Sequence, residues 1–183
     1  MRISLREQIL AAVFAAIIGI LSQFVITLPI TVVPFTLQTF IIGLTVTILG
    51  MRTGTWAIVI YLLLGLIGIP VYAGGASGIG ALLGPTGGFL IGFIFNGLVT
   101  GGILAKTKLN FLWSIIANLA GAAVVLLFGA AWMHFGTGMT FSAALNAAVI
   151  PFILPGILKA VAAAVIGVLI VGRLPQRFLT PAK

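Results

Sequence analysis

The chain has 183 residues, of which 62% are hydrophobic and 5% are charged. A sequence this apolar cannot cover a core with a polar surface, which excludes a soluble protein and indicates a polytopic membrane protein. The net charge of +8 comes from residues too scattered for a nucleic-acid surface, and the absence of cysteine excludes disulfides and thiolate metal sites.

Long apolar runs predict six membrane helices in one all-α domain that covers the whole chain, 1–183. The first run continues to about Leu28, which is longer than the apolar part of a signal peptide, so we interpret it as a retained helix. Thr86 is the expected N-cap of the fourth helix. The expected spans are about 8–27, 35–50, 55–70, 86–105, 110–133 and 143–172.

The basic residues fall on one side of these spans. They precede the first span, separate the second from the third and the fourth from the fifth, and follow the sixth, whereas the opposite loops contain neither lysine nor arginine. The positive-inside rule therefore predicts cytoplasmic termini and a multi-pass membrane protein in contact with lipids. These residues are Arg2, Arg6, Arg52, Lys106, Lys108, Arg173, Arg177 and Lys183.

The first span carries small residues four apart, which let another helix approach closely. Their spacing alone leaves two interpretations open, packing inside this protein and docking to a separate membrane subunit, and it favours packing. The residues are Ala11, Ala12, Ala15 and Ala16.

Polar residues begin the second span. Thr36, Gln38 and Thr39 are expected in the outer third of the membrane, where polar side chains face protein or water rather than lipid. A second unusual stretch, Pro70 to Phe89, holds seven glycines and no charge. Glycine permits positive φ and close approach of the backbone to a ligand, so we expect a folded outer loop that dips toward the helices.

Lys159 lies inside the last apolar segment. Pro151 and Pro155 predict a broken or re-entrant start to that segment, which places Lys159 about one turn below the break and in the outer half of the membrane. An ammonium group is costly there, so a functional role is predicted, with strained snorkelling as the structural alternative. The chain's only carboxylate side chain, Glu7, lies on the other side, so a ligand's carboxylate or carbonyl group is the expected partner.

Four stretches match a known family. They are VPFTLQTF at 33–40, YLLLGLIGIPVYAGG at 61–75, GIGALLGPTGGFLIGF at 78–93 and, more weakly, PFILPGILKA at 151–160. In these motifs and their order the chain resembles the BioY family, the biotin-binding S components of energy-coupling factor (ECF) transporters.

The resemblance implies a six-helix S-component bundle that captures biotin at the outer face and delivers it across the membrane. It also implies that the alanines of the first span dock on an EcfT-like transmembrane subunit, while two ATPase subunits supply energy. The chain itself has no G-x-x-x-x-G-K-[ST] phosphate-binding loop. No enzymatic activity, cofactor or metal is expected, and the sequence leaves open whether the protein acts alone, as a homodimer or with a shared module.

The expected biotin pocket lies between the glycine-rich loop, which would gate it, and the outer ends of the helices. Lys159 would supply a positive or hydrogen-bond-donating group, while Tyr72 and Trp132 would form apolar walls. The complete expected set is Lys159, Gln38, Thr36, Tyr72, Gly74, Gly75, Ser77, Thr86, Asn118 and Trp132.

One position departs from the family pattern. Members usually have an Asp three residues before the matching lysine, in a Pro-Gly-Asp context, and this chain has Gly156 there, or Ile157 if the Pro-Gly pair is aligned. That Asp would accept from the ureido N–H groups of biotin. Its absence indicates a weaker site, a rearranged one, or a related ligand such as lipoate. The candidate replacement acceptors are Gln38, Ser77, Asn96 and Asn118.

Three other functions compete, of which a purely structural scaffold leaves Lys159 and the glycine-rich loop unexplained. Gly75-Ala76-Ser77-Gly78 matches the G-x-S-G of rhomboid intramembrane proteases, with His134 as the base. That dyad needs serine and histidine within hydrogen-bond reach, and His134 is expected in a short outer loop after the fifth span. A channel or facilitator is disfavoured because the sequence has neither a ring of charge nor an inverted repeat.

Overall fold

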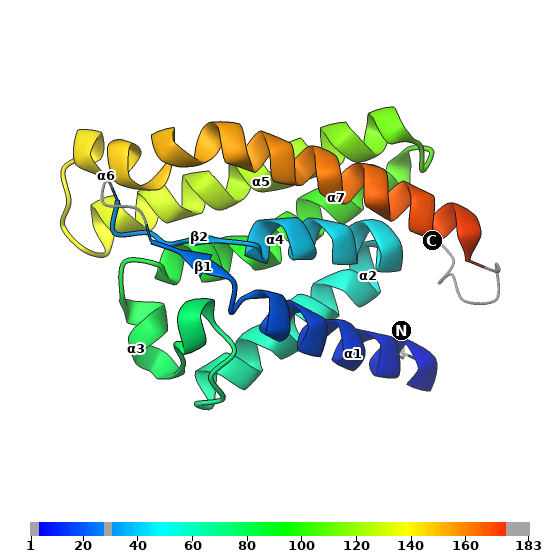
Figure 1. Ribbon diagram of the computed structural model, residues 1–183, viewed down its shortest axis with the longest axis horizontal. Helices are drawn as coiled ribbons and strands as arrows, with labels where there is room; N and C mark the ends of the chain where they lie inside the picture. The colour runs from blue at the N-terminus through cyan, green and yellow to red at the C-terminus, as the bar shows by residue number, and fades with distance from the viewer. Residues whose placement is uncertain (1–3, 28–30, 175–183) are drawn as a thin grey trace.

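The structure, a computed structural model, describes residues 4–27 and 31–174 (Figure 1). Arg2, Arg177 and Lys183 of the expected topology lie outside these ranges. The described chain is almost entirely helical, with one two-stranded antiparallel sheet. Its elements are α1 Leu5–Leu21, β1 Val25–Ile26, β2 Phe35–Thr36, α2 Gln38–Leu66, η1 Ala73–Gly75, α3 Gly78–Leu83, α4 Gly87–Lys106, α5 Phe111–Phe135, α6 Phe141–Ala148, η2 Ile150–Phe152 and α7 Ile153–Arg173.

Helix α2 is bent into two halves at Gly50, which has a φ of 76° that side chains rarely tolerate. The amide of Gln38 donates to the hydroxyl of Tyr61 at 2.6 Å, although the two residues are 23 apart. A straight helix would separate them by roughly 34 Å at 1.5 Å per residue. The chain therefore reverses at Gly50, and the two halves of α2 are the expected second and third spans.

The described helices form six membrane spans. By length and hydropathy the described ranges contain four candidate spanning segments, Gln38–Leu66, Gly87–Lys106, Phe111–Phe135 and Phe141–Arg173. The first of these is the reversed α2, and α1 adds one further helix of 17 residues. The all-α fold and its six spans agree with the sequence, and the broken start of the last segment is confirmed as α6, η2 and α7.

The third span was expected to reach residue 70, but α2 ends at Leu66. Two other expected boundaries are wrong for one shared reason. The first span was expected to reach residue 27 and the second to begin at 35, but α1 ends at Leu21 and α2 begins at Gln38. The intervening residues pair instead, with Val25 opposite Thr36 and Ile26 opposite Phe35. Hydropathy alone cannot separate a short apolar strand from the end of an apolar helix.

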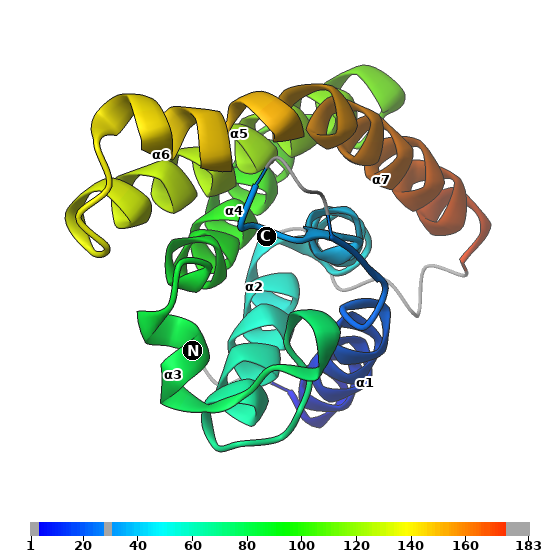
Figure 2. The same cartoon turned by 60° about the vertical axis from the view of Figure 1, so that its left-hand side comes forward.

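The two ends of the bundle differ. In Figure 1, α3, α6 and the strand pair gather at one end, whereas the start of α1, the bend of α2, the α4–α5 connection and the end of α7 gather at the other. Figure 2 turns the first end toward the viewer. The second end carries the described basic residues other than Lys159, namely Arg6, Arg52, Lys106, Lys108 and Arg173. We call the first end the outer end and the second the inner end.

The surface of the bundle carries many large apolar side chains. Leu127 on α5 and Leu158 on α7 are 65% and 63% exposed. Large exposed apolar side chains on helices of this length are stable in contact with lipid tails. The interior is packed closely by small residues, as where Gly88 of α4 lies against Trp132 of α5.

Candidate ligand-binding site

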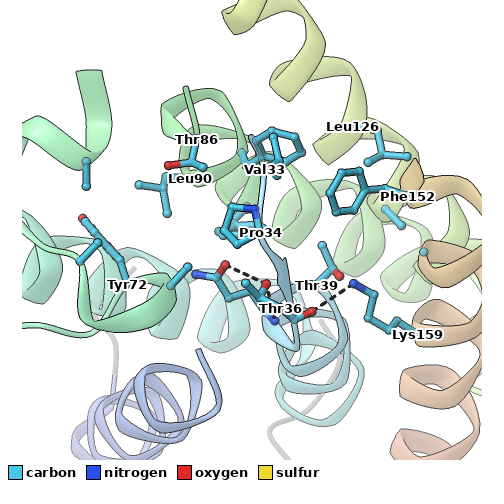
Figure 3. Close-up of a pocket in the computed structure, with 18 residues that line it drawn as sticks. Val33, Pro34, Thr36, Thr39, Tyr72, Thr86, Leu90, Leu126, Phe152 and Lys159 are labelled. Atoms are coloured by element: carbon cyan, nitrogen blue, oxygen red, sulfur yellow. Dashed lines mark hydrogen bonds between the residues drawn. The ribbon is translucent and has the colours of Figure 1, made fainter. Parts of the chain in front are cut away.

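A cavity of about 850 Å³, its open mouth included, lies toward the outer end between α2, α4, α5, α7 and the loop after α2. Figure 3 shows side chains from these separate segments pointing into it. Its wall is mainly apolar and includes Val33, Pro34, Phe89, Leu90, Phe93 and Phe152. Its polar groups are few and come from Thr36, Gln38, Thr39, Tyr72, Thr86 and Lys159. No aspartate or glutamate lines it.

Lys159 reaches the cavity from the second turn of α7. Its Nζ atom donates to the backbone carbonyl of Thr36 at 3.1 Å and lies 4.5 Å from the centroid of the Phe35 ring. Phe35 in turn stacks on Phe152 at 5.5 Å, so the ammonium group has a rigid apolar support. Because the carbonyl and the ring are both neutral, its charge is not compensated there and stays available to an anion.

Gln38 belongs to a buried chain of hydrogen bonds at the start of α2. Its Nε2 donates to Tyr61, and its Oε1 accepts from the Thr36 hydroxyl at 3.0 Å. The Tyr61 hydroxyl also contacts the hydroxyl of Ser22, the C-cap residue of α1, at 3.2 Å. The polar edge of the cavity is therefore connected to the outer end of α1.

The glycine-rich loop forms one side of the cavity through Tyr72. The side chain of Tyr72 is buried, its hydroxyl donates to the Leu62 carbonyl at 2.5 Å, and its ring packs edge-on against Tyr61. Burial raises the pKa of the Tyr72 hydroxyl, so this group is neutral at ordinary pH. Its ring lies so close to Gly65 that a side chain there would overlap it. The loop is thus seated on the second half of α2.

Other contacts hold the same loop in place. Gln23, just beyond α1, donates from its amide to the carbonyls of Pro70 at 3.2 Å and Tyr72 at 3.4 Å. Trp132 donates from its indole to the Gly84 carbonyl at 3.0 Å. The loop between α2 and α4 is therefore tied to α1 on one side and to α5 on the other.

The structure brings together Lys159, Gln38, Thr36, Tyr72 and Thr86 of the expected set around one cavity. Thr86 is also the N-cap residue of α4, as expected, although its side chain makes no capping hydrogen bond. These five residues come from four segments that lie far apart in the sequence, which is typical of a binding site built by the fold.

Five other expected residues lie outside the cavity lining. Gly74 and Gly75 have φ of 63° and 82°, and the turn that they allow presents the neighbouring Ala73 and Ala76 to the cavity instead. Ser77 begins α3, and Trp132 supports the loop. Asn118 lies between α2 and α5, where its Nδ2 donates to the Thr47 hydroxyl and the Ser114 carbonyl, both at 2.9 Å. Asn118 of α5 thus bonds to α2, and its buried Oδ1 atom has no hydrogen-bond partner among the described residues.

Sequence reasoning missed Thr39 as a site residue. Thr39 lines the cavity, and its buried hydroxyl has no hydrogen-bond partner. Figure 3 shows it pointing into the cavity beside Lys159. Its position one residue after Gln38 on a polar helix start was the available signal, but helical phase decides which neighbour faces inward.

Gly156 marks open space in the cavity wall. It lines the cavity one turn before Lys159, and a Cβ atom built there would have no neighbour within 4 Å. Gly156 is one of the two positions, with Ile157, at which the sequence comparison expected an acidic residue, and of the two it is the one that lines the cavity. A Cβ atom therefore has room at this position.

A shallow apolar groove adjoins the cavity on the other side of Lys159. Phe24, Val25 and Ile26 line it from the β1 side, and Pro155 and Leu158 line it from α7. Thr36 and Lys159 border both hollows. The hydrogen bond between these two residues therefore belongs to the wall that separates the cavity from the groove.

The four alanines of α1 do not share one face. Ala11 and Ala15 are buried to 2% and 1% exposure in the core that α1 forms with α2, whereas Ala12 and Ala16 are exposed. The expectation that all four dock on a partner is corrected for Ala11 and Ala15, because this chain already covers them. Only Ala12 and Ala16 offer a small-residue surface to another helix.

The Ser-His pair of the protease alternative is not assembled. The Nδ1 atom of His134 is hydrogen-bonded to the Met139 carbonyl at 2.7 Å, and its ring lies against Phe135 and Phe141. Ser77 lies at the start of α3 in a different loop. No hydrogen bond joins the two side chains, which this mechanism requires.

A family model and named relatives agree with the family expected from the sequence. The model of the BioY family matches residues 1–176. The chain belongs to the BioY family. Among BioY proteins, "Biotin transporter BioY2" of Lactococcus lactis subsp. cremoris is 42% identical over 162 residues, which are 88% of each chain. "Biotin transporter BioY" of Thermotoga maritima is 36% identical over 88% of this chain and 94% of its own.

A solved structure agrees with this BioY assignment. It is described as the crystal structure at 2.1 Å of the S-component for biotin from an ECF-type ABC transporter. It superposes with a TM-score of 0.85 over 95% of each chain at 28% identity. The resemblance and the S-component bundle inferred from the sequence are confirmed, and these relatives are named as transporters rather than enzymes.

Proposed function

We propose that this protein is the substrate-binding S component of an ECF transporter, which captures biotin at the outer face of the membrane and delivers it inward. The observation that carries this proposal is the cavity at the outer end, with the uncompensated ammonium group of Lys159 in a mostly apolar wall. Family membership and the names of the relatives support biotin as the ligand.

The chemistry of biotin matches the cavity. Biotin has a carboxylate at the end of an apolar chain and a bicyclic ring with two ureido N–H donors and one carbonyl acceptor. Lys159 would bind an oxygen of this ligand, the carboxylate first, because a charge-assisted bond is strongest where water is excluded. The phenylalanine wall suits the ring and the chain, which a largely apolar pocket with few polar groups selects.

The glycine-rich loop would gate this cavity. It forms one wall through Tyr72, Ala73, Ala76 and Ala81, and its short helix α3 packs against α2 and α4. Glycines with positive φ at positions 68, 74, 75 and 78 supply backbone conformations that other residues would resist. Opening would require the contacts of Gln23 and Trp132 with the loop to break.

Transport would need partners that supply energy. The exposed Ala12 and Ala16 of α1 would dock on an EcfT-like transmembrane subunit, which in turn binds two ATPase subunits. The basic inner end supports a cytoplasmic orientation of that end, in the cytoplasmic membrane of a bacterium or archaeon. A homodimer is the alternative arrangement for uptake without the module.

Titration of the purified protein with biotin, dethiobiotin and lipoate tests the ligand. Biotin and dethiobiotin share the ureido group, and lipoate shares only the carboxylate, the chain and the sulfur. We expect saturable biotin binding that lipoate does not match. Tighter binding of lipoate would replace biotin as the ligand, an outcome that the open space at Gly156 would explain. No binding of any of the three would reject the proposal.

A further inference from the structure

The acceptor groups of the cavity can be counted from its hydrogen bonds. The Tyr72 hydroxyl is directed to the Leu62 carbonyl, and the Thr36 carbonyl accepts from Lys159. The cavity lining has no carboxylate. Among the side chains of the lining, the amide oxygen of Gln38 is a stronger acceptor than the hydroxyls of Thr39 and Thr86, and only one of its two lone pairs is used, by the Thr36 hydroxyl.

An amide presents its oxygen only if its orientation is fixed. A half-turn of the Gln38 amide would exchange Oε1 and Nε2 and present a donor to the same place. A neighbouring group must therefore favour one orientation of the amide over the other. The two groups that contact this amide are the Thr36 hydroxyl on the oxygen side and the Tyr61 hydroxyl on the nitrogen side.

Tyr61 makes this distinction through Ser22. The single hydroxyl hydrogen of Ser22 is directed to the Ile18 carbonyl at 2.7 Å. Because Ser22 has one hydroxyl hydrogen and its bond to Ile18 is the shorter of the two, we assign the 3.2 Å contact between the two hydroxyls to donation by Tyr61. With its hydrogen committed, the Tyr61 oxygen can only accept, so it selects the amide nitrogen of Gln38. Tyr61 and Ser22 are both fully buried, which makes an unsatisfied alternative costly.

We propose that Tyr61 and Ser22 are positioning residues that hold the carbonyl oxygen of Gln38 toward the cavity, where it is the neutral acceptor for a ureido N–H of the ligand. This inference rests on the proposed function, because it assigns one part of biotin to one atom of the site. The carboxylate would be bound by Lys159, and the ureido ring would be recognised without a charged group.

A protein–ligand double-mutant cycle tests the assignment. Biotin and its analogues methylated at one or the other ureido nitrogen are titrated into the wild type, Tyr61→Phe and Gln38→Met. In the wild type one methylated analogue is expected to bind at least about tenfold more weakly than biotin. In Tyr61→Phe and Gln38→Met this ratio is expected to fall at least about threefold, because biotin loses the bond that the analogue already lacks.

Gln38→Glu combined with Tyr61→Phe separates positioning from folding. A carboxylate accepts through both oxygens and needs no fixed orientation, so the double variant is expected to regain the discrimination that Tyr61→Phe loses. Thr100→Val is the matched control, because it removes a buried hydroxyl that bonds Asn96 and the Ala117 carbonyl outside the cavity. It is expected to keep the wild-type ratio.

The outcomes distinguish the two proposals. If the wild type binds biotin and Tyr61→Phe keeps the full discrimination, the positioning role is overturned and the proposed function stands. If the ratio falls in both single variants but the double variant of Gln38→Glu and Tyr61→Phe does not regain the discrimination, Tyr61 acts on packing alone and the inference is again overturned. If the wild type does not bind biotin, both proposals fail together.

Discussion

The ammonium group of Lys159 donates to the main-chain carbonyl of Thr36 across 123 residues of sequence. This bond joins α7 to β2 at the side of the cavity, and Figure 3 shows it beside the open volume. It gives the one charged group of the cavity a fixed position without neutralising it. A ligand that brings an anion to this point would find the cation already placed.

Removal of the ammonium group should weaken ligand binding most. For Lys159→Met, which keeps the length and apolar character of the side chain, we expect biotin affinity to fall by about 2 kcal/mol or more, since a charge-assisted bond is lost. Isothermal titration in detergent measures this change. Lys108→Met at the inner end is the control and should bind as the wild type does. Unchanged affinity in Lys159→Met would refute the assigned role.

A larger side chain should have different effects on the exposed and the buried face of α1. Ala16→Leu adds a side chain to the exposed face, so biotin binding should stay within about twofold while uptake in cells with the complete transporter is lost. Ala15→Leu adds the same atoms to the buried face and should lower the free energy of unfolding by about 1–3 kcal/mol through overpacking. Thermal denaturation and uptake assays on both variants check the contrast, and equal behaviour of the two would contradict it.

A carboxylate at position 156 should be accommodated and should bind the ligand's N–H groups. Gly156→Asp places it in open space one helical turn from Lys159. We expect biotin to bind tighter by about 1 kcal/mol, the value of one added hydrogen bond. Gly156→Ala fills the same space without an acceptor and should leave affinity nearly unchanged. Weaker binding in Gly156→Asp alone would show that the new carboxylate neutralises Lys159 instead.

The seat of Tyr72 on α2 should be sensitive to a single methyl group. Gly65→Ala would overlap the Tyr72 ring, so we expect the free energy of unfolding to fall by about 1–3 kcal/mol and biotin binding to weaken as the loop shifts. Gly102→Ala on α4 meets only an ordinary contact with Met51 and should be neutral or slightly stabilising. Melting curves with and without biotin measure both effects. A fully stable Gly65→Ala would mean that Tyr72 moves freely.

Much of the fold could be predicted because lipid imposes simple rules on sequence. Apolar runs marked the spans, the basic residues marked the inner end, and Pro151 and Pro155 marked the break before α7. The strand pair could not be predicted, because Val25 and Ile26 are as apolar as the helix before them and only their partners at Phe35 and Thr36 make them a strand.

A site residue could be predicted when burying its charge in the membrane costs free energy. The role of a residue that is polar but uncharged could not be predicted in this way. Lys159 stood out because a buried charge needs a reason, and it does face the cavity. Asn118 stood out for the same kind of reason, but its partner is Thr47 of a neighbouring helix. Spacing also could not tell Ala11 from Ala12, because which face of α1 meets α2 is decided by tertiary packing.

The oxygen that holds Lys159 belongs to the peptide backbone. Every residue type supplies this atom, so no exchange of the Thr36 side chain can delete it. Side-chain substitutions in β2 would leave the ammonium group in place. Only a substitution of Lys159 or a movement of the strand would break this hydrogen bond. Substitutions at position 36 can thus change the ligand selectivity of the cavity, while Lys159 keeps its position for binding an anion.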